Sequence, residues 1–275
     1  MRRHSLRRSM ALLVVFLLVV LVAPHFAPYN PDGETTVSLT SNQPPSLAHP
    51  MGTDPTDRDL LSRVLRGSQT SVIISISAVA IMLVLGTSFG IMAALSGGRV
   101  ETVMMRVLDI GMSVPRFLML LAATSIADTP YSLPQLILLI GVTGWFDIAR
   151  ITRGEVAEIL ARDWIFAARA TGTGAARLVT HHIFPHVVPI LIVMATFGIG
   201  RTVVLEAGLS FLGASSSGAS LGHLLNDGFS PLGNRWWLTV FPGLAIVLIV
   251  LACNALGDAL RDVFAPEQVH AWPTT

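Results

Sequence analysis

The sequence predicts an all-α integral membrane protein with six transmembrane helices. Of its 275 residues, 52% are hydrophobic and only 13% are charged, and the mean hydropathy is +0.66. Soluble domains carry about 25% charged residues, so this composition places the chain in the membrane class. Long runs with few charges recur along the chain, and about 20 apolar residues are enough for a helix to cross a bilayer.

The six expected helices follow one another along the chain. The first, Met10–Ala23, comes directly after four arginines in residues 1–9. It is followed by a poor cleavage site, which favours an uncleaved helix over a signal peptide. The other five expected helices are Val72–Leu95, Val107–Ala127, Leu133–Ala149, Val187–Leu212 and Leu238–Leu260.

These helices divide the chain into four parts. Residues 1–28 hold the N-terminus and the first helix, and residues 29–71 form a polar loop with a short amphipathic helix at the membrane surface. Residues 72–265 carry the other five helices, and residues 266–275 form a tail. Most arginines fall on the side of the N-terminus, so the positive-inside rule places both termini in the cytoplasm. The expected location is the cytoplasmic membrane, which the chain crosses several times.

A polar connector, residues 150–186, separates the fourth and fifth expected helices. Within it, Trp164–Ala170 is rich in alanine and arginine, which favours a short helix. Thr171–Gly174 contains two glycines and breaks that helix. Ala175–Ile183 then predicts a second helix, which is expected to end at Pro185 because proline interrupts helical hydrogen bonding. On the expected topology, this helix–turn–helix lies at the cytoplasmic surface.

Composition and motifs exclude several functions. All 18 basic side chains are arginine, so the chain lacks the lysine of a phosphate-binding P-loop and is not expected to hydrolyse nucleotide. A net charge of +1 argues against nucleic-acid binding. The single cysteine, Cys253, excludes disulfide and cysteine-ligated metal frameworks. His181, His182 and His186 have no carboxylate or cysteine beside them, which favours a role in loop structure over metal binding. No cofactor or metal is expected in this chain.

Two charged residues, Arg201 and Glu206, fall inside the fifth expected helix. Each would cost about 2.5–3.5 kcal/mol near the bilayer centre if it faced lipid. They are therefore expected either to face a water-filled translocation path or to make a structural contact with another helix. Asp109 falls near a helix end, where helix capping or a contact with Arg106 is expected.

Four segments resemble motifs of the permease subunits of ABC importers. Ala167, Ala168, Gly172 and Pro185 match the alanine, glycine and proline positions of the family's "EAA" coupling loop, although Phe166 replaces its glutamate. The other three segments resemble motifs of the C-type permeases for dipeptides, oligopeptides and nickel. They are residues 49–63 (HPMGTD and RDLLSR), 205–213 (LEAGLSFLG) and 236–262 (WW, FPG and NALGDALRD).

The resemblance implies a type I ABC-importer transmembrane fold. It implies that the coupling-loop residues dock on one or two separate ATP-binding subunits, which would hold ATP and Mg²⁺. It also implies a homologous second permease subunit and an extracytoplasmic substrate-binding protein. Dipeptides or oligopeptides are the implied substrates, with nickel chelates and haem-like ligands as alternatives. Outside this family, a secondary transporter would show internal repeats, which are not evident, and an intramembrane hydrolase would need residues that the sequence lacks.

Overall fold

The computed structural model describes residues 20, 22–30, 42–126, 130–214, 220–229 and 235–264. Within these residues every named element is helical, and one isolated β-bridge joins Thr53 and Asp59. The elements are η1 (Ala23–Phe26), α2 (Leu60–Ser96), α3 (Gly98–Ser113), α4 (Arg116–Ile126), α5 (Leu133–Thr143), α6 (Phe146–Leu160), α7 (Asp163–Ala170), α8 (Ala175–Leu178), η2 (Val179–Ile183), α9 (Phe184–Phe211), α10 (Leu221–Gly228) and α11 (Trp236–Phe264).

Three helical stretches of the described chain are long and apolar enough to cross a membrane, and up to five if each of two bent helix pairs forms one span. Three are continuous: α2, the run Ala175–Phe211 that joins α8, η2 and α9, and α11. Two are bent pairs, α3 with α4 at 73° and α5 with α6 at 43°. These five correspond to the second through sixth helices expected from the sequence. The first expected helix, Met10–Ala23, lies almost wholly outside the described residues.

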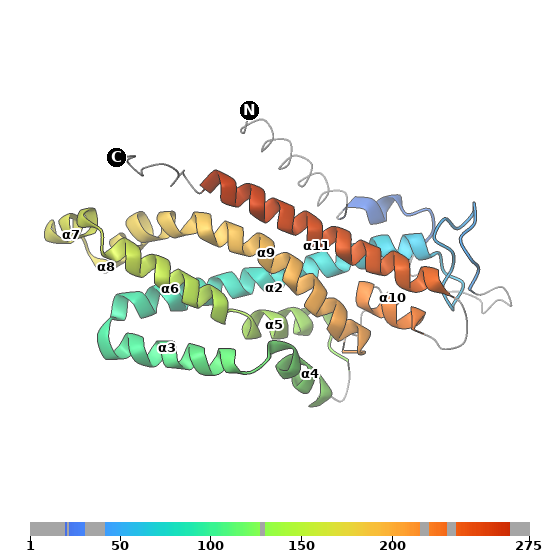
Figure 1. Cartoon of the computed structure of the whole chain (residues 1–275), viewed down its shortest axis with the longest axis horizontal. Helices are drawn as coiled ribbons and strands as arrows, with labels where there is room; N and C mark the ends of the chain where they lie inside the picture. The colour runs from blue at the N-terminus through green and yellow to red at the C-terminus, as the bar shows by residue number, and fades with distance from the viewer. Residues whose placement is uncertain are drawn as a thin grey trace, which may run out of the picture.

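Helix α2 is the centre of the bundle, and α5, α6 and α9 pack around it (Figure 1). Small residues let α6 approach closely. A Cβ added at Gly86 would lie 2.7 Å from the side chain of Ile148, and one added at Gly90 would lie 2.6 Å from the carbonyl oxygen of Ala149. Small residues at such crossings are typical of membrane bundles, where close packing drives helix association.

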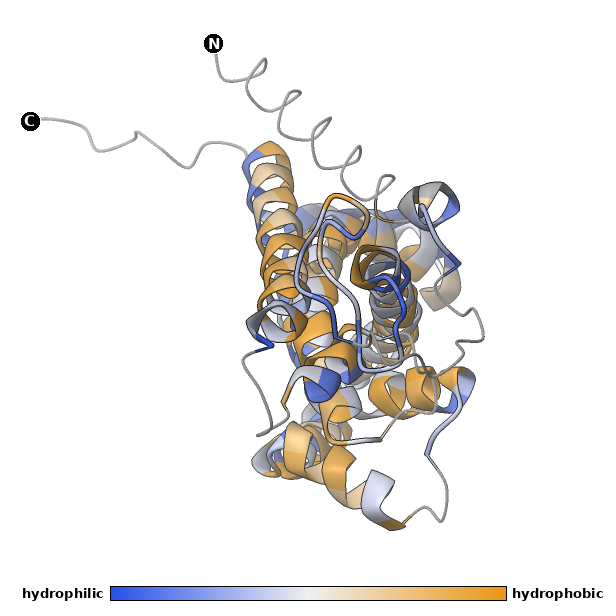
Figure 2. Ribbon diagram, turned by 90° about the vertical axis from the view of Figure 1, so that its right-hand side faces the viewer, coloured by the Kyte–Doolittle hydropathy of each residue, from blue (hydrophilic) through white to orange (hydrophobic). Residues whose placement is uncertain are grey.

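The outward faces of several helices are apolar, as expected for contact with lipid. Figure 2 shows hydrophobic residues along the helices, with the polar loop that precedes α2 at the end nearest the viewer. On α3, Val103 and Ile110 are exposed, and on α11 so are Val247 and Leu251. A soluble protein would bury such side chains, so these surfaces fit a bilayer.

Helix α2 begins earlier than the sequence suggested. A separate interfacial helix was expected before residue 72, but a single helix starts at Leu60 and runs for 37 residues. The Asp59 carboxylate caps it by accepting hydrogen bonds from the backbone N–H of Ser62 at 2.8 Å and from its hydroxyl at 2.7 Å. At 1.5 Å per residue α2 is about 55 Å long, well beyond the roughly 30 Å hydrocarbon core. Its first turns therefore extend past the bilayer.

Pro185 does not end a helix, contrary to the sequence prediction. The chain passes without a break from α8 through the π-helical turn η2 into α9, where Pro185 occupies the first turn. Proline lacks the N–H that an α-helix needs, and its ring crowds the preceding turn. The wider π turn immediately before Pro185 accommodates both effects, and the helix continues.

Candidate functional site

The connector segment from α7 to α8 forms one pole of the molecule (Figure 1). Helix α7 ends at Ala170 with Thr171 as its C-cap residue, after which Gly172 adopts a positive φ of 83°. The N–H of Gly172 donates to the carbonyl oxygen of Arg169 at 3.0 Å, and the N–H of Thr173 donates to that of Ala168 at 3.2 Å. This pair of bonds is a Schellman cap, in which glycine is favoured because it takes the left-handed conformation without strain.

The predicted coupling residues do not all face the same way. Ala167, Gly172 and Pro185 are exposed at the pole, whereas Ala168 is half-buried against the hydrophobic core. Ile165 is fully buried and anchors α7 to the bundle. The side chains of Phe166 and Phe184 are 56% and 44% exposed beside these residues. The pole thus presents small and aromatic side chains that the described residues leave partly uncovered.

The histidines of the connector have a packing role. The ring of His186 stacks on Trp164 with 5.2 Å between ring centroids, and the ring of His182 lies 5.9 Å from the same indole. The His186 Nδ1 is 2.6 Å from the carbonyl oxygen of His182. Across the described residues, no group of histidine, cysteine, aspartate or glutamate side chains is arranged to hold a metal ion.

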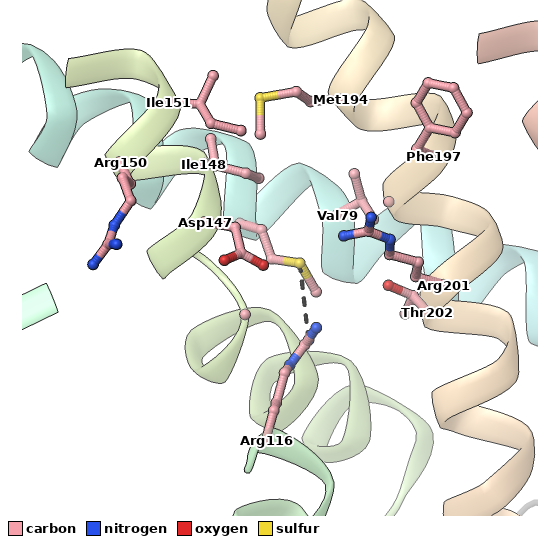
Figure 3. A pocket seen from close by; sticks show the side chains of 13 residues that line it. Val79, Arg116, Asp147, Ile148, Arg150, Ile151, Met194, Phe197, Arg201 and Thr202 are labelled. Carbon is pink, nitrogen blue, oxygen red and sulfur yellow. Dashed lines mark hydrogen bonds between the residues drawn. The ribbon is translucent and has the colours of Figure 1, made fainter. Parts of the chain in front are cut away.

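A cavity of about 440 Å³ lies midway between the two poles, among α2, α6 and α9 (Figure 3). Four charged side chains line it: Arg116, Asp147, Arg150 and Arg201. Most of the remaining wall is apolar. It consists of Val79, Met82, Gly144, Ile148, Ile151, Met194, Phe197, Gly198 and Thr202.

Two of these arginines are held by groups of this chain. Arg150 forms an ion pair with Asp109, so the partner of Asp109 is Arg150 and not Arg106 as the sequence suggested. Arg116 donates from Nη2 to the carbonyl oxygen of Ile140 at 2.7 Å, and Asp147 is the acidic group whose charge acts on it. The Nε atom of Arg116 is buried without a hydrogen-bond partner.

Arg201 differs from the other two, because among the described residues it makes no hydrogen bond or ion pair. It is exposed, and it also lines a second cavity of about 550 Å³ with Asn254 and Asp258 of α11. Facing lipid at this depth would cost about 2.5–3.5 kcal/mol. Arg201 thus lies on the walls of both cavities.

Glu206 has a different environment, although the sequence suggested the same role for it. It is fully buried, and its carboxylate accepts hydrogen bonds from the hydroxyls of Ser71 on α2 and Ser210 on α9, both at 2.7 Å. It lines neither of the two cavities that hold Arg201. Residues five apart on an α-helix are about 140° apart around its axis, and this spacing was the sequence signal that the two residues face different ways.

A polar cluster at the other pole was not anticipated. Asp54 is fully buried in the loop before α2. Its carboxylate pairs with Arg58 and Arg63, and Arg63 reaches Asp227 of α10 at 3.0 Å. Burial alone would raise the pKa of the Asp54 carboxyl, but the backbone N–H of Arg58, the Arg63 guanidinium and the Thr56 hydroxyl together hold it below its ordinary value.

Comparisons with known proteins identify relatives of the chain. The family model described as "Binding-protein-dependent transport system inner membrane component" matches residues 86–269, and the model for the "N-terminal TM domain of oligopeptide transport permease C" matches residues 7–45. The "Oligopeptide transport system permease protein OppC" of Bacillus subtilis is 32% identical over 272 residues, covering 97% of this chain and 88% of that protein.

Two further comparisons agree with these. The "Probable D,D-dipeptide transport system permease protein DdpC" of Escherichia coli is 34% identical over 262 residues, covering 94% of this chain and 86% of that protein. Among solved structures, a chain of the MetNI methionine ABC transporter in an inward-facing conformation aligns with a TM-score of 0.64 and 19% identity. That alignment covers 75% of this chain and 98% of the other, and it shows the shared fold.

Proposed function

Because the chain belongs to the family of binding-protein-dependent transport system inner membrane components, we propose that it is the permease subunit of an ATP-driven importer that carries peptides across the cytoplasmic membrane. The family and the type I ABC permease fold are shown by the comparisons. Peptides as the substrate class are supported by the names of the two relatives, which align along most of their length.

The pole formed by α7 and α8 is the proposed docking site for a separate ATP-binding subunit. Two observations support this proposal: α7 ends in a Schellman cap, and the exposed residues Ala167 and Gly172 are small enough to permit close approach of a partner. The exposed rings of Phe166 and Phe184 beside them favour a partner that covers apolar surface. One or two such subunits would bind ATP and Mg²⁺, because this chain has no lysine from which to build a P-loop.

The two cavities that share Arg201 are the proposed half of a translocation path. A homologous second permease subunit would complete it, and an extracytoplasmic binding protein would deliver the substrate. The support is a mid-helix guanidinium that reaches water through cavities of a size typical for small ligands. Glu206 is left out of the path, because it is buried and its hydrogen bond from Ser71 joins α9 to α2.

The proposed orientation places both termini and the α7 pole in the cytoplasm. The polar loop that contains Asp54 lies at the opposite end of the long axis (Figure 1), and it would therefore face outward, where a binding protein arrives. The excess of arginine on the side of the N-terminus supports this orientation.

Substitution of Gly172 tests the coupling role. Gly172→Leu should abolish peptide uptake by the reconstituted complex and weaken copurification of the ATP-binding subunits, because a bulky side chain would hold the pole away from its partner. A Cβ at Gly172 or at Gly174 meets no atom of this chain within 4 Å, so neither substitution disturbs internal packing. Gly174→Leu is the matched control and should be milder.

A second variant separates bulk from backbone strain. The positive φ of Gly172 disfavours any larger residue, but asparagine tolerates this conformation better than leucine does. Asparagine and leucine have the same number of side-chain heavy atoms, so coupling by Gly172→Asn but not by Gly172→Leu would indicate that backbone strain limits docking. Equal loss in both variants would indicate that bulk limits it. Normal uptake by Gly172→Leu, or equal damage from Gly174→Leu, would remove this pole from the coupling mechanism.

A further inference from the structure

We propose that Arg201 is a carboxylate-binding subsite on the translocation path and that it receives the C-terminal carboxylate of the peptide as it passes. The inference rests on the proposed function, and it adds the chemical group that the path recognises. It concerns the cavity among α2, α6 and α9, where Arg201 lies with its guanidinium among the lining side chains (Figure 3).

Of the three arginines around this cavity, Arg201 is the one with neither an ion pair nor a hydrogen bond among the described residues. Arg150 is paired with Asp109, and its side chain points away from the cavity centre in Figure 3. Arg116 is fixed by the carbonyl oxygen of Ile140 and has Asp147 as its acidic neighbour. Arg201 has no hydrogen-bond or ion-pair partner within the part of the chain that the structure describes.

The surroundings of Arg201 strengthen its attraction for an anion. Val79, Met194 and Phe197 provide an apolar wall close to the guanidinium, and a low-dielectric wall reduces the screening of a charge–charge contact. A guanidinium offers paired N–H donors that match the two oxygens of a carboxylate. Every peptide with a free C-terminus carries this group, so the subsite does not depend on the side chains of the substrate.

Asp147 shares the first cavity with Arg201 but forms no ion pair with it among the described residues. Asp258 shares the second cavity with Arg201. It lies towards the α7 pole, because the neighbouring Gly257 packs against Thr196 and Phe197, four to five residues before Arg201 on α9. That offset is about 6–8 Å along the helix axis, and Asp258 and Arg201 form no ion pair within the described residues. Arg201 is thus left open to a carboxylate from outside the chain.

The test uses the full complex reconstituted in liposomes: both permease subunits, the ATP-binding subunits and the binding protein. Two randomised tripeptide libraries serve as probes, one with a free C-terminal carboxylate and one with a C-terminal amide. Uptake of each library is measured by mass spectrometry and normalised to the amount of that library bound to the binding protein. The normalisation corrects for any preference of the binding protein for one of the two libraries. The variants are Arg201→Gln, Arg201→Lys and, as a control on the same cavity, Arg150→Gln.

Arg201→Gln should lower uptake of the free-carboxylate library about tenfold to a hundredfold, the loss expected for one charge-assisted contact, and leave uptake of the amide library within twofold. Arg201→Lys should fall between wild type and Arg201→Gln, because it keeps the charge and loses the paired donors. Arg150→Gln should leave the ratio of the two libraries within twofold of wild type.

Three outcomes would count against these claims in different ways. An equal loss for both libraries in Arg201→Gln would overturn the carboxylate subsite. Dissociation of the two permease subunits in this variant would also overturn it, since Arg201 would then serve as a structural ion pair with the second permease. A wild-type complex that imports neither library would instead refute the proposed peptide transport.

Discussion

Gly222→Ala should destabilise the protein strongly, because this glycine sets the distance between α10 and α9. A Cβ added at Gly222 would lie 2.0 Å from the carbonyl oxygen of Ala207 and 2.8 Å from its Cα. An ordinary van der Waals contact begins near 3.4 Å, so α10 would have to move by about 1.4 Å. The obstacle is helix backbone, which cannot rotate away as a side chain can.

The size of the effect follows from two opposing terms. Overpacking costs about 1–3 kcal/mol, and a backbone obstacle favours the upper end of that range. Alanine recovers about 0.5–1 kcal/mol of helix propensity relative to glycine. The movement would also loosen Leu221 and Leu224, which are 0% and 1% exposed. We therefore expect a net loss of about 2 kcal/mol in the free energy of unfolding.

The assay is unfolding of the purified chain in mixed micelles with increasing denaturing detergent. The matched control is Gly154→Ala in α6, where an added Cβ meets no atom within 4 Å. This control should be stabilised by about 0.5–1 kcal/mol, since only the propensity term acts. If Gly222→Ala unfolds at the same detergent fraction as wild type while the control behaves as expected, the close packing of α10 on α9 is refuted.

Two further predictions concern buried carboxylates. Glu206→Ala should lose about 2–5 kcal/mol of stability in the same assay, since it leaves the hydroxyls of Ser71 and Ser210 unsatisfied beside a new cavity. Glu206→Gln should lose less, and equal losses would contradict the hydrogen bonds described here. Because the pKa of Asp54 is lower in the folded loop than in an unfolded chain, its contribution to stability is present above about pH 4 and is lost as the pH falls through the folded value. Protease sensitivity of the loop that contains Asp54 should therefore rise below pH 4, and Asp54→Asn should be sensitive already at pH 7 with little further change.

The features predicted well from the sequence are those set by local composition. Helix α7, Asp163–Ala170, matches the expected Trp164–Ala170 within one residue, because alanines favour a helix and the glycines that follow end it. The five described spans were likewise predicted from runs of apolar residues. The bends in two of these spans also have local causes, since Pro115 lies between α3 and α4 and Gly144 lies between α5 and α6.

The features that the sequence did not predict depend on distant contacts. Arg63 and Asp227 are 164 residues apart, and only the fold brings them within 3.0 Å. The start of α2 at Leu60 depends on the Asp59 cap and on packing beyond the bilayer, which hydropathy cannot detect. Pro185 was misjudged because a local rule for proline takes no account of the π turn that tertiary packing stabilises before it.

The continuity of the run Ala175–Phe211 connects the proposed coupling pole to the proposed path. Arg201 lies 16 residues beyond Pro185, which is about 24 Å along the helix at 1.5 Å per residue. No loop intervenes over this distance, although Pro189 lies inside α9 and removes one helical hydrogen bond. A displacement of α7 by an ATP-binding subunit would therefore be passed along one continuous helical run. The hydrogen bond from Ser71 of α2 to Glu206 fixes α9 to α2 beyond Arg201. Arg201 lies about 8 Å along the helix from Glu206, whereas the α7 pole lies much farther from it. A given displacement of the pole would therefore move Arg201 by a smaller amount. On this geometry the proposed coupling stroke would change the access to Arg201 from either side of the membrane while the contact between α9 and α2 at Glu206 is kept.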